Sequence, residues 1–155
     1  MRTIRTTAAF AVASVIALLG TAAATGTAVA SDSQGISGQA VAAVPSGCSA
    51  GNFCFWNNSY YGDGPGQVSG NNSNYTVFPH SSCPYQTWND CISSVYNDGT
   101  SGLGVAVYLD AGDSRTSASW CVPDNVGYTL LPQYYPGTTT VLNDSISANF
   151  WTSAC

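Results

Sequence analysis

The chain contains no lysine and no glutamate, and its only positive side chains besides the single histidine are three arginines. With 7% charged residues, it lies far below the ~25% that is usual for soluble domains. A nucleic-acid binder needs a basic patch that neutralises phosphates, and this composition cannot form one. Long surface helices normally rely on Glu and Lys, so a helical bundle is also disfavoured. The length of 155 residues suits one domain.

The first 30 residues, Met1–Ala30, have the three parts of a secretory signal peptide. Two arginines precede the apolar run Ala8–Leu19, which is too short to span a bilayer because spanning takes about 20 residues. Small residues then predict cleavage after Ala30, with Ala24 as the alternative, and a membrane anchor is the less favoured interpretation. Cleavage leaves one arginine against eight aspartates, a formal net charge of −7. We expect the mature product to be soluble, secreted and extracellular.

Residues 31–46 are small and polar and show no periodicity, which is typical of a flexible leader or a short pro-segment. The folded domain is predicted to begin near Gly47 and to run to Cys155. A domain of this length can form one core, but a small one.

Six cysteines lie in the predicted domain, and in an exported chain this even number indicates disulfide bonds. Zinc is the disfavoured alternative, because the chain has no CxxC pair and His80 is its only histidine. Each bridge would add a few kcal/mol of stability by restricting the unfolded chain. Six cysteines allow 15 pairings. Short spacing favours Cys48 with Cys54 and Cys83 with Cys91, which leaves Cys121 with Cys155.

Short apolar segments rich in β-branched and aromatic residues alternate with clusters of Gly, Asn, Asp, Ser and Pro, which favour turns. No segment after the signal has a sustained period of 3.6 residues. The pattern predicts an all-β sandwich or barrel. The predicted strands are Phe53–Trp56, Tyr75–Phe78, Ile92–Tyr96, Val105–Leu109, Tyr128–Leu131 and Ile146–Trp151.

An internal repeat is the most informative feature of the sequence. The segment Trp88–Ser94 returns 54 residues later as Leu142–Ala148, with hydrophobic-Asn-Asp-x-Ile-Ser in common. Repeats reveal the unit of an architecture. A unit of this length suits four short strands, as in a Greek key, and two such units would pack as a sandwich.

The repeated segment has the chemistry of a calcium site, because Asn and Asp side chains, backbone carbonyls and Ser hydroxyls are hard oxygen ligands. The alternative is that these residues form Asx and Ser turns that bond to their own backbone before a strand. The candidate calcium ligands are Asn89, Asp90, Cys91 and Ser93 in the first copy and Asn143, Asp144, Ser145 and Ser147 in the second.

These residues carry a resemblance to a known family. The first copy, Asn89–Ser94, matches the [Asn/Asp]-[Asn/Asp]-x-x-[Ser/Thr]-Ser motif of βγ-crystallin domains, and the second, Asn143–Ala148, matches except at its last residue. Trp56 with Tyr61-Gly62 is similar to the aromatic hairpin that opens such a Greek key. The resemblance implies two calcium sites, each drawing on both motifs. The implied ligands are Asp90, the Cys91 carbonyl and Ser93, and Asp144, the Ser145 carbonyl and Ser147.

A narrower resemblance covers the first two thirds of the domain. The stretch Pro45–Cys54, together with Ser94–Thr100 and Cys121-Val122, resembles the streptomycete metalloproteinase-inhibitor family. That family is exported and has a βγ-crystallin-like fold, and its Cys-Val bond lies in the loop that faces the protease. The resemblance therefore implies that Cys121-Val122 is the inhibitory bond. In the family a second Cys five residues later closes this loop, and here that position is Val126.

The sequence favours inhibition over the other functions that its residues could support. A Ser-His-Asp catalytic set would have to use His80, which lies in a segment without a nucleophile elbow, so we expect no enzyme. Aromatic residues in an all-β domain of this size are more often core than carbohydrate-binding surface. The preferred hypothesis is a βγ-crystallin-like inhibitor of extracellular (metallo)proteases. The alternatives are a calcium-binding structural module and a small antimicrobial or toxin-like binding protein. We expect a monomer without nucleic-acid or membrane partners after signal cleavage.

Overall fold

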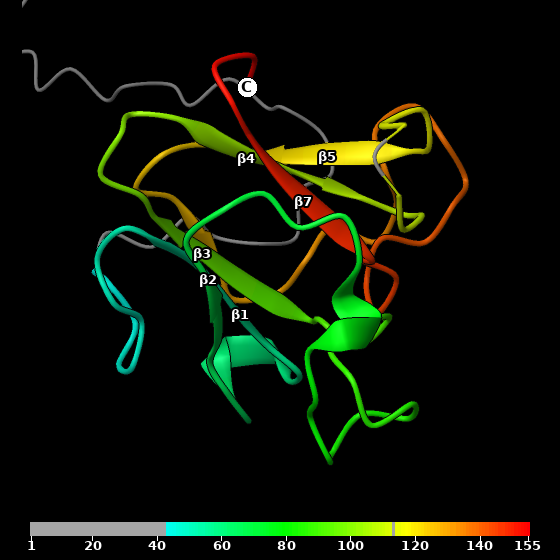
Figure 1. Ribbon diagram of the computed structural model, residues 1–155, viewed down its shortest axis with the longest axis horizontal. Helices are drawn as coiled ribbons and strands as arrows, with labels where there is room; N and C mark the ends of the chain where they lie inside the picture. The colour runs from blue at the N-terminus through cyan, green and yellow to red at the C-terminus, as the bar shows by residue number, and fades with distance from the viewer. Residues whose placement is uncertain (1–42, 113) are drawn as a thin grey trace, which may run out of the picture. The chain divides into compact units, whose positions relative to one another are not determined.

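The structure is a computed structural model that describes residues 43–112 and 114–155. The predicted signal peptide (1–30) and most of the predicted leader lie outside the described residues. Within the described ranges the regular elements are strands and short 3-10 helices (Figure 1), and none of these helices is long and apolar enough to cross a membrane. In chain order they are β1 (Asn52–Trp56), η1 (Ser59–Tyr61), β2 (Gly66–Val68), η2 (Tyr75–Val77), β3 (Ser94–Asp98), β4 (Gly104–Tyr108), β5 (Ser119–Val122), β6 (Gly127–Tyr128) and β7 (Ala148–Thr152).

The strands form two antiparallel sheets, with the orders β2-β1-β3-β6 and β5-β4-β7. Although β6 lies between β5 and β7 in the chain, it pairs with β3 in the first sheet, where Val95 is opposite Tyr128. Conversely, a segment of the first half lies beside the second sheet, because a β-bridge joins Asn72, after β2, to Asn149 of β7. Each half of the chain thus gives one segment to the other half's sheet. This exchange confirms the predicted all-β, βγ-crystallin-like sandwich of two Greek keys.

The repeat in the sequence corresponds to the two halves of this fold. The first copy ends at Ser94, the first residue of β3, and the second copy ends at Ala148, the first residue of β7. Each of these strands pairs with the first long strand of its own sheet, β3 with β1 and β7 with β4. The repeated segments therefore enter the sandwich at equivalent places.

One predicted strand, Tyr75–Phe78, is wrong, because this segment forms the 3-10 helix η2. The Asn74 side chain accepts a hydrogen bond from Thr76 N at 2.9 Å, and Phe78 N donates to Tyr75 O at 3.2 Å. Such local bonds compete with strand pairing. Tyr75 is nevertheless fully buried, whereas Val77 is 66% exposed, so the apolar pattern identified one core residue but not the backbone conformation. The other predicted segments overlap strands, to which the structure adds β2 and β5.

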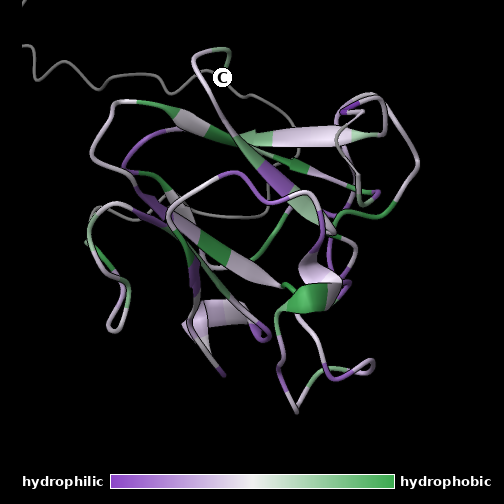
Figure 2. Cartoon of the chain, viewed as in Figure 1, coloured by the Kyte–Doolittle hydropathy of each residue, from purple (hydrophilic) through white to green (hydrophobic). Residues whose placement is uncertain are grey.

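The main core lies between the two sheets, and β1 buries side chains on both of its faces. Phe53 and Phe55 point into the main cluster with the valines of β4. Cys54 and Trp56 point the other way and pack with Tyr96 in a second cluster. Because successive side chains of a strand face opposite sides, this double burial explains the unbroken apolar run of β1. Figure 2 shows green alternating with pale or purple colour along the strands, and mostly pale or purple colour in the loops.

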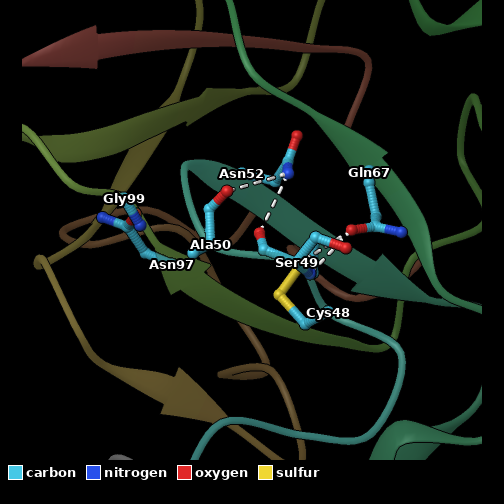
Figure 3. The surroundings of a disulfide bond; sticks show 8 residues. Cys48, Ser49, Ala50, Asn52, Gln67, Asn97 and Gly99 are labelled. Atoms are coloured by element: carbon cyan, nitrogen blue, oxygen red, sulfur yellow. Dashed lines mark hydrogen bonds between the residues drawn. A yellow bond between two sulfur atoms is a disulfide. The ribbon is translucent and has the colours of Figure 1, made fainter.

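Three disulfide bonds staple the fold in the pairing that short spacing favours: Cys48–Cys54, Cys83–Cys91 and Cys121–Cys155. Beside the first bridge, Ser49 N donates to Gln67 Oε1 at 2.8 Å, and Asn52 Nδ2 donates to Ser49 O at 2.9 Å (Figure 3). The bridge and these bonds hold the segment before β1 against the β1–β2 hairpin.

Candidate functional site

The two repeated loops meet in the structure and bond to each other reciprocally. Asp90 N donates to Ile146 O at 3.2 Å, and Asp144 N donates to Ile92 O at 3.0 Å. Both isoleucines are fully buried in the main core. Each loop is therefore positioned by its own buried isoleucine and by the backbone of the other loop.

The polar side chains of the loops repeat this exchange. Ser93 Oγ donates to Asp144 Oδ1 at 2.8 Å, and Ser147 Oγ donates to Asp90 Oδ1 at 3.2 Å. The Ser of each copy thus bonds to the Asp of the other copy. Both aspartates have positive φ, 53° for Asp90 and 55° for Asp144. Asp tolerates this left-handed conformation better than most residues do.

The two carboxylates also accept hydrogen bonds from their preceding asparagines. Asn89 Nδ2 lies 2.6 Å from Asp90 Oδ2, and Asn143 Nδ2 lies 2.7 Å from Asp144 Oδ2. In this orientation both asparagine Oδ1 atoms are buried without a hydrogen-bond partner among the described residues. Buried polar atoms normally find a partner, so two equivalent unpartnered oxygens mark these loops as places where an additional group could bind.

The electrostatic surroundings of Asp90 oppose its ionisation. Burial raises the pKa of the Asp90 carboxyl above its ordinary value, and the negative charge of Asp110 raises it further. Hydrogen bonds from Ser147 and Asn89 act in the opposite direction and lower this pKa. A positive charge next to the carboxylate would favour its ionised form.

The carboxylate and hydroxyl oxygen atoms of the two loops are of the type that binds a hard cation such as calcium. One group of such oxygens consists of the Asp90 carboxylate and the Ser147 hydroxyl. The other consists of the Asp144 carboxylate and the Ser93 hydroxyl. Within residues 43–112 and 114–155 no three His, Cys, Asp or Glu side chains gather at one point. A cation at either position would therefore depend largely on neutral oxygens.

Other predicted ligands have roles of their own in the fold. Cys91 is in a disulfide bond, so its carbonyl is the atom left to act as a ligand. Ser145 Oγ donates to Val141 O at 2.6 Å and to Leu142 O at 2.9 Å, as the alternative of a Ser turn predicts. The Ser145 carbonyl lies 3.5 Å from the Tyr135 hydroxyl.

The predicted inhibitory bond, Cys121-Val122, lies at the end of β5, which has a neighbouring strand on one side only among the described strands. The Val122 side chain is fully buried and its residue is opposite Val105. The Cys121 side chain is bonded to Cys155 near the C-terminus. The bond is thus part of an extended edge strand, with the Val122 side chain in the core and the Val122 carbonyl bonded to the buried Asn97 side chain.

The turn that follows β5 is held in place by Asn97 of β3. Asn97 N donates to Val126 O at 3.0 Å, and Asn97 Nδ2 donates to Val122 O at 3.3 Å and to Leu103 O at 3.0 Å. Within the turn, Val126 N donates to Pro123 O at 3.3 Å. Asn97 is fully buried. The fold therefore brings together two stretches that resemble the inhibitor family, Ser94–Thr100 and Cys121-Val122.

His80 lies in a different place from both of these features. Its Nε2 is 3.2 Å from Asp63 Oδ2. A hydrogen bond from Asn57 is the main cause that lowers the pKa of Asp63, and Ser82 and His80 contribute in the same direction against a smaller opposing effect of burial. A nucleophile–base pair of the Ser-His type is not formed by these residues.

Some of these contacts had no signal in the sequence. The contact between Asp63 and His80 joins residues from separate turns, and neither lies in a motif. The role of Asn97 is likewise a matter of tertiary structure, although it lies inside a stretch with a family resemblance. The crosswise pairing of Ser93 with Asp144 follows from the repeat only once the two loops are known to meet.

Comparison with known proteins finds one matching family model and several similar solved structures. The sequence model of peptidase inhibitor family I36 matches residues 41–128. No curated protein sequence is similar to the chain at a significant level.

The similar solved structures are βγ-crystallin domains. One comes from work on the evolution of the eye-lens βγ-crystallin domain fold; it is 19% identical with a TM-score of 0.49, covering 74% of this chain and 97% of that one. A βγ-crystallin from Ciona intestinalis is 18% identical with a TM-score of 0.46, covering 66% of this chain and 100% of its own. A βγ-crystallin domain from Clostridium beijerinckii is 19% identical with a TM-score of 0.43, covering 65% and 97%. The strand topology, rather than these similarities, defines the fold.

Proposed function

The chain belongs to peptidase inhibitor family I36, and on this basis we propose that it is a secreted inhibitor of extracellular proteases that binds them through the edge of β5 and the turn after it. The observation that supports this surface is the extended backbone of Cys121-Val122 at a sheet edge with one neighbouring strand. An exposed strand edge can pair with an extended segment of a partner protein.

The surface is also preorganised, which an inhibitor needs because ordering a loop on binding reduces affinity. The family resemblance implies a second Cys at the position of Val126. Here the disulfide bond between Cys121 and Cys155 ties β5 to the C-terminal residue. Asn97 holds the turn through hydrogen bonds to Val122 O and Val126 O. The turn is thus fixed without the second cysteine.

The target class is tested with the disulfide-intact protein against thermolysin and subtilisin. We expect inhibition of the metalloprotease. The Pro123→Gly variant loosens the exposed turn and should raise the inhibition constant about tenfold, which corresponds to ~1.4 kcal/mol. Pro136→Gly, in an exposed turn elsewhere, is the matched control and should leave the constant unchanged. Absence of inhibition of either protease would refute the function, and an unchanged constant for Pro123→Gly would refute the surface.

Secretion is part of the same proposal. A small domain in which all six cysteines form disulfide bonds is typical of oxidising, extracellular environments. Sequencing the N-terminus of the exported protein should give Ser31 as the first residue, or Thr25 if the alternative cleavage site is used. An N-terminus at Met1 in the exported protein would contradict a cleaved signal.

A second function, stabilisation by calcium, is supported by the reciprocal Ser–Asp pairs and by the two unpartnered oxygens of Asn89 and Asn143. Calcium would supply positive charge to Asp90 and Asp144. A ligand that binds only the folded state stabilises it, by about 2.7 kcal/mol at 100 times its dissociation constant.

This function is tested by melting the protein in millimolar calcium and in chelator. We expect a higher melting temperature in calcium, and a smaller calcium effect in the Asp90→Asn and Asp144→Asn variants. Asp98→Asn, outside both loops, should respond as the wild type does. Equal melting temperatures with calcium and with chelator would exclude stabilisation by calcium, whatever the outcome of the inhibition assay.

A further inference from the structure

A hairpin-like loop formed by residues 79–87, hereafter the 79–87 loop, follows η2 and extends away from both sheets at the lower right of Figure 1. It is closed by the bridge between Pro79 and Thr87 and by His80 N donating to Gln86 O at 2.9 Å. Two successive turns lie inside it, with Cys83 N donating to His80 O at 3.1 Å and Gln86 N donating to Cys83 O at 2.9 Å. The backbone of the loop is therefore held by its own hydrogen bonds.

The base of the 79–87 loop is anchored to the core. Cys83 is 4% exposed, belongs to the main hydrophobic cluster and is bonded to Cys91. The His80 ring stacks on Trp88, with ring centroids 4.0 Å apart and planes at 8°. On its other side His80 contacts Asp63. A disulfide bond, a ring stack and the contact with Asp63 thus fix a loop of nine residues.

The tip of the loop presents a large aromatic side chain that the fold does not use. Tyr85 is 71% exposed, whereas Tyr75, Tyr96 and Tyr135 are almost fully buried. The two neighbours of Tyr85, Pro84 and Gln86, are also exposed. A rigid support for one exposed tyrosine has no evident benefit for stability.

The chemistry of the tip indicates the kind of pocket that it fits. The 79–87 loop contains no aspartate and no arginine, in a chain with a negative net charge. Tyrosine provides a large contact area at low conformational cost and is enriched among the residues that dominate binding energy. An uncharged aromatic tip on a preorganised loop suits a deep apolar pocket.

We propose that the 79–87 loop is a second, independent protease-binding site, in which Tyr85 enters a specificity pocket that accepts large aromatic side chains. This proposal rests on the inhibitor function proposed above, and it adds a target class. In Figure 1 β5 crosses the top of the molecule and the 79–87 loop lies at the lower right. Because the two surfaces are at opposite ends, each can engage a separate protease molecule.

Chymotrypsin and trypsin provide a matched pair of probes, because they share a fold but differ in the pocket, which is apolar in the first and negatively charged in the second. We expect the wild-type protein to inhibit chymotrypsin and not trypsin. The Tyr85→Ala variant should weaken inhibition of chymotrypsin at least tenfold, and Tyr85→Phe should retain it. Tyr60→Ala, which removes a tyrosine of similar exposure from another turn, is the control and should bind chymotrypsin as the wild type does.

The outcomes separate this proposal from the first one. Inhibition of thermolysin that depends on Pro123 but not on Tyr85, together with inhibition of chymotrypsin that depends on Tyr85 but not on Pro123, would support two sites. Equal inhibition of chymotrypsin by the wild type and Tyr85→Ala would overturn the 79–87 site alone. Absence of inhibition of chymotrypsin would also overturn the 79–87 site. Rapid cleavage after Tyr85 would do the same, because the loop would then be a substrate. Loss of thermolysin inhibition with retained chymotrypsin inhibition would overturn only the β5 surface.

Discussion

Replacing Cys121 and Cys155 together with alanine should destabilise the protein more than the loss of either shorter bridge. This bond closes a sequence separation of 34 residues, whereas the other two close 6 and 8. In the chain-entropy relation, a ring of this size stabilises the fold by about 4 kcal/mol, against about 2.4 kcal/mol for the ring closed by Cys48 and Cys54. A loss of this size is a large part of the 5–15 kcal/mol that is typical of a domain.

Guanidinium denaturation measures the effect directly. The midpoint should fall, and the slope m should rise because the unfolded chain without the bridge is less compact and exposes more surface. The same variant should inhibit thermolysin less well at a temperature where it is fully folded, because β5 has lost its tether. The double variant at Cys48 and Cys54 is the control for inhibition, because that bridge joins β1, in the other sheet, to the segment before it.

Two results would refute this reasoning. A loss of less than about 1 kcal/mol for the alanine pair at Cys121 and Cys155 would show that ring size does not control its contribution. Unchanged inhibition by the folded variant would show that the tether of β5 is not needed for binding. The first result concerns the physics of the unfolded chain, and the second concerns the proposed surface.

Three further predictions concern single residues. Gly104→Ala should lower the melting temperature and favour reduction of the third bridge, because an added Cβ would overlap Cys155 Sγ; a thiol assay after mild reductant checks this. Tyr75→Phe should cost about 1–2 kcal/mol in denaturation, since its hydroxyl donates to buried Asn149 Oδ1 at 2.7 Å. In chelator, stability should fall as the pH rises from the ordinary pKa of Asp90 to its raised folded value, because the folded state binds more protons there; Asp90→Asn should remove that slope.

The local features of the chain were open to prediction because their causes are local. Two disulfide bonds join cysteines 6 and 8 residues apart, so spacing identified them and the third followed by elimination. Strand and turn residues alternate at short range, which indicated an all-β fold. The segment Tyr75–Phe78 shows where such patterns fail. An Asn side chain two residues before Thr76 caps the backbone, and apolar content does not distinguish a 3-10 turn from a strand.

The candidate sites depended more heavily on contacts between distant residues. The repeat identified both Asn-Asp loops, but the bonds of Ser93 to Asp144 and of Ser147 to Asp90 cross 51 and 57 residues. The resemblance predicts Cys121-Val122 as the inhibitory bond, but the burial of Val122 is a property of the completed sandwich. The anchoring of Tyr85 depends on a stack between His80 and Trp88, whose spacing has no known motif.

The sequence by itself determined that this protein has few charges, six cysteines to pair, and two related halves that each contain an Asn-Asp-x-Ile-Ser segment. Only the tertiary structure decided that the halves exchange strands, that their loops bond crosswise, and that β5 and the 79–87 loop lie at opposite ends. The physical reason is the range of the interactions. Turn preference, side-chain alternation and short ring closure act between near neighbours in the chain, whereas burial and the choice of hydrogen-bond partner are decided only when distant segments pack together.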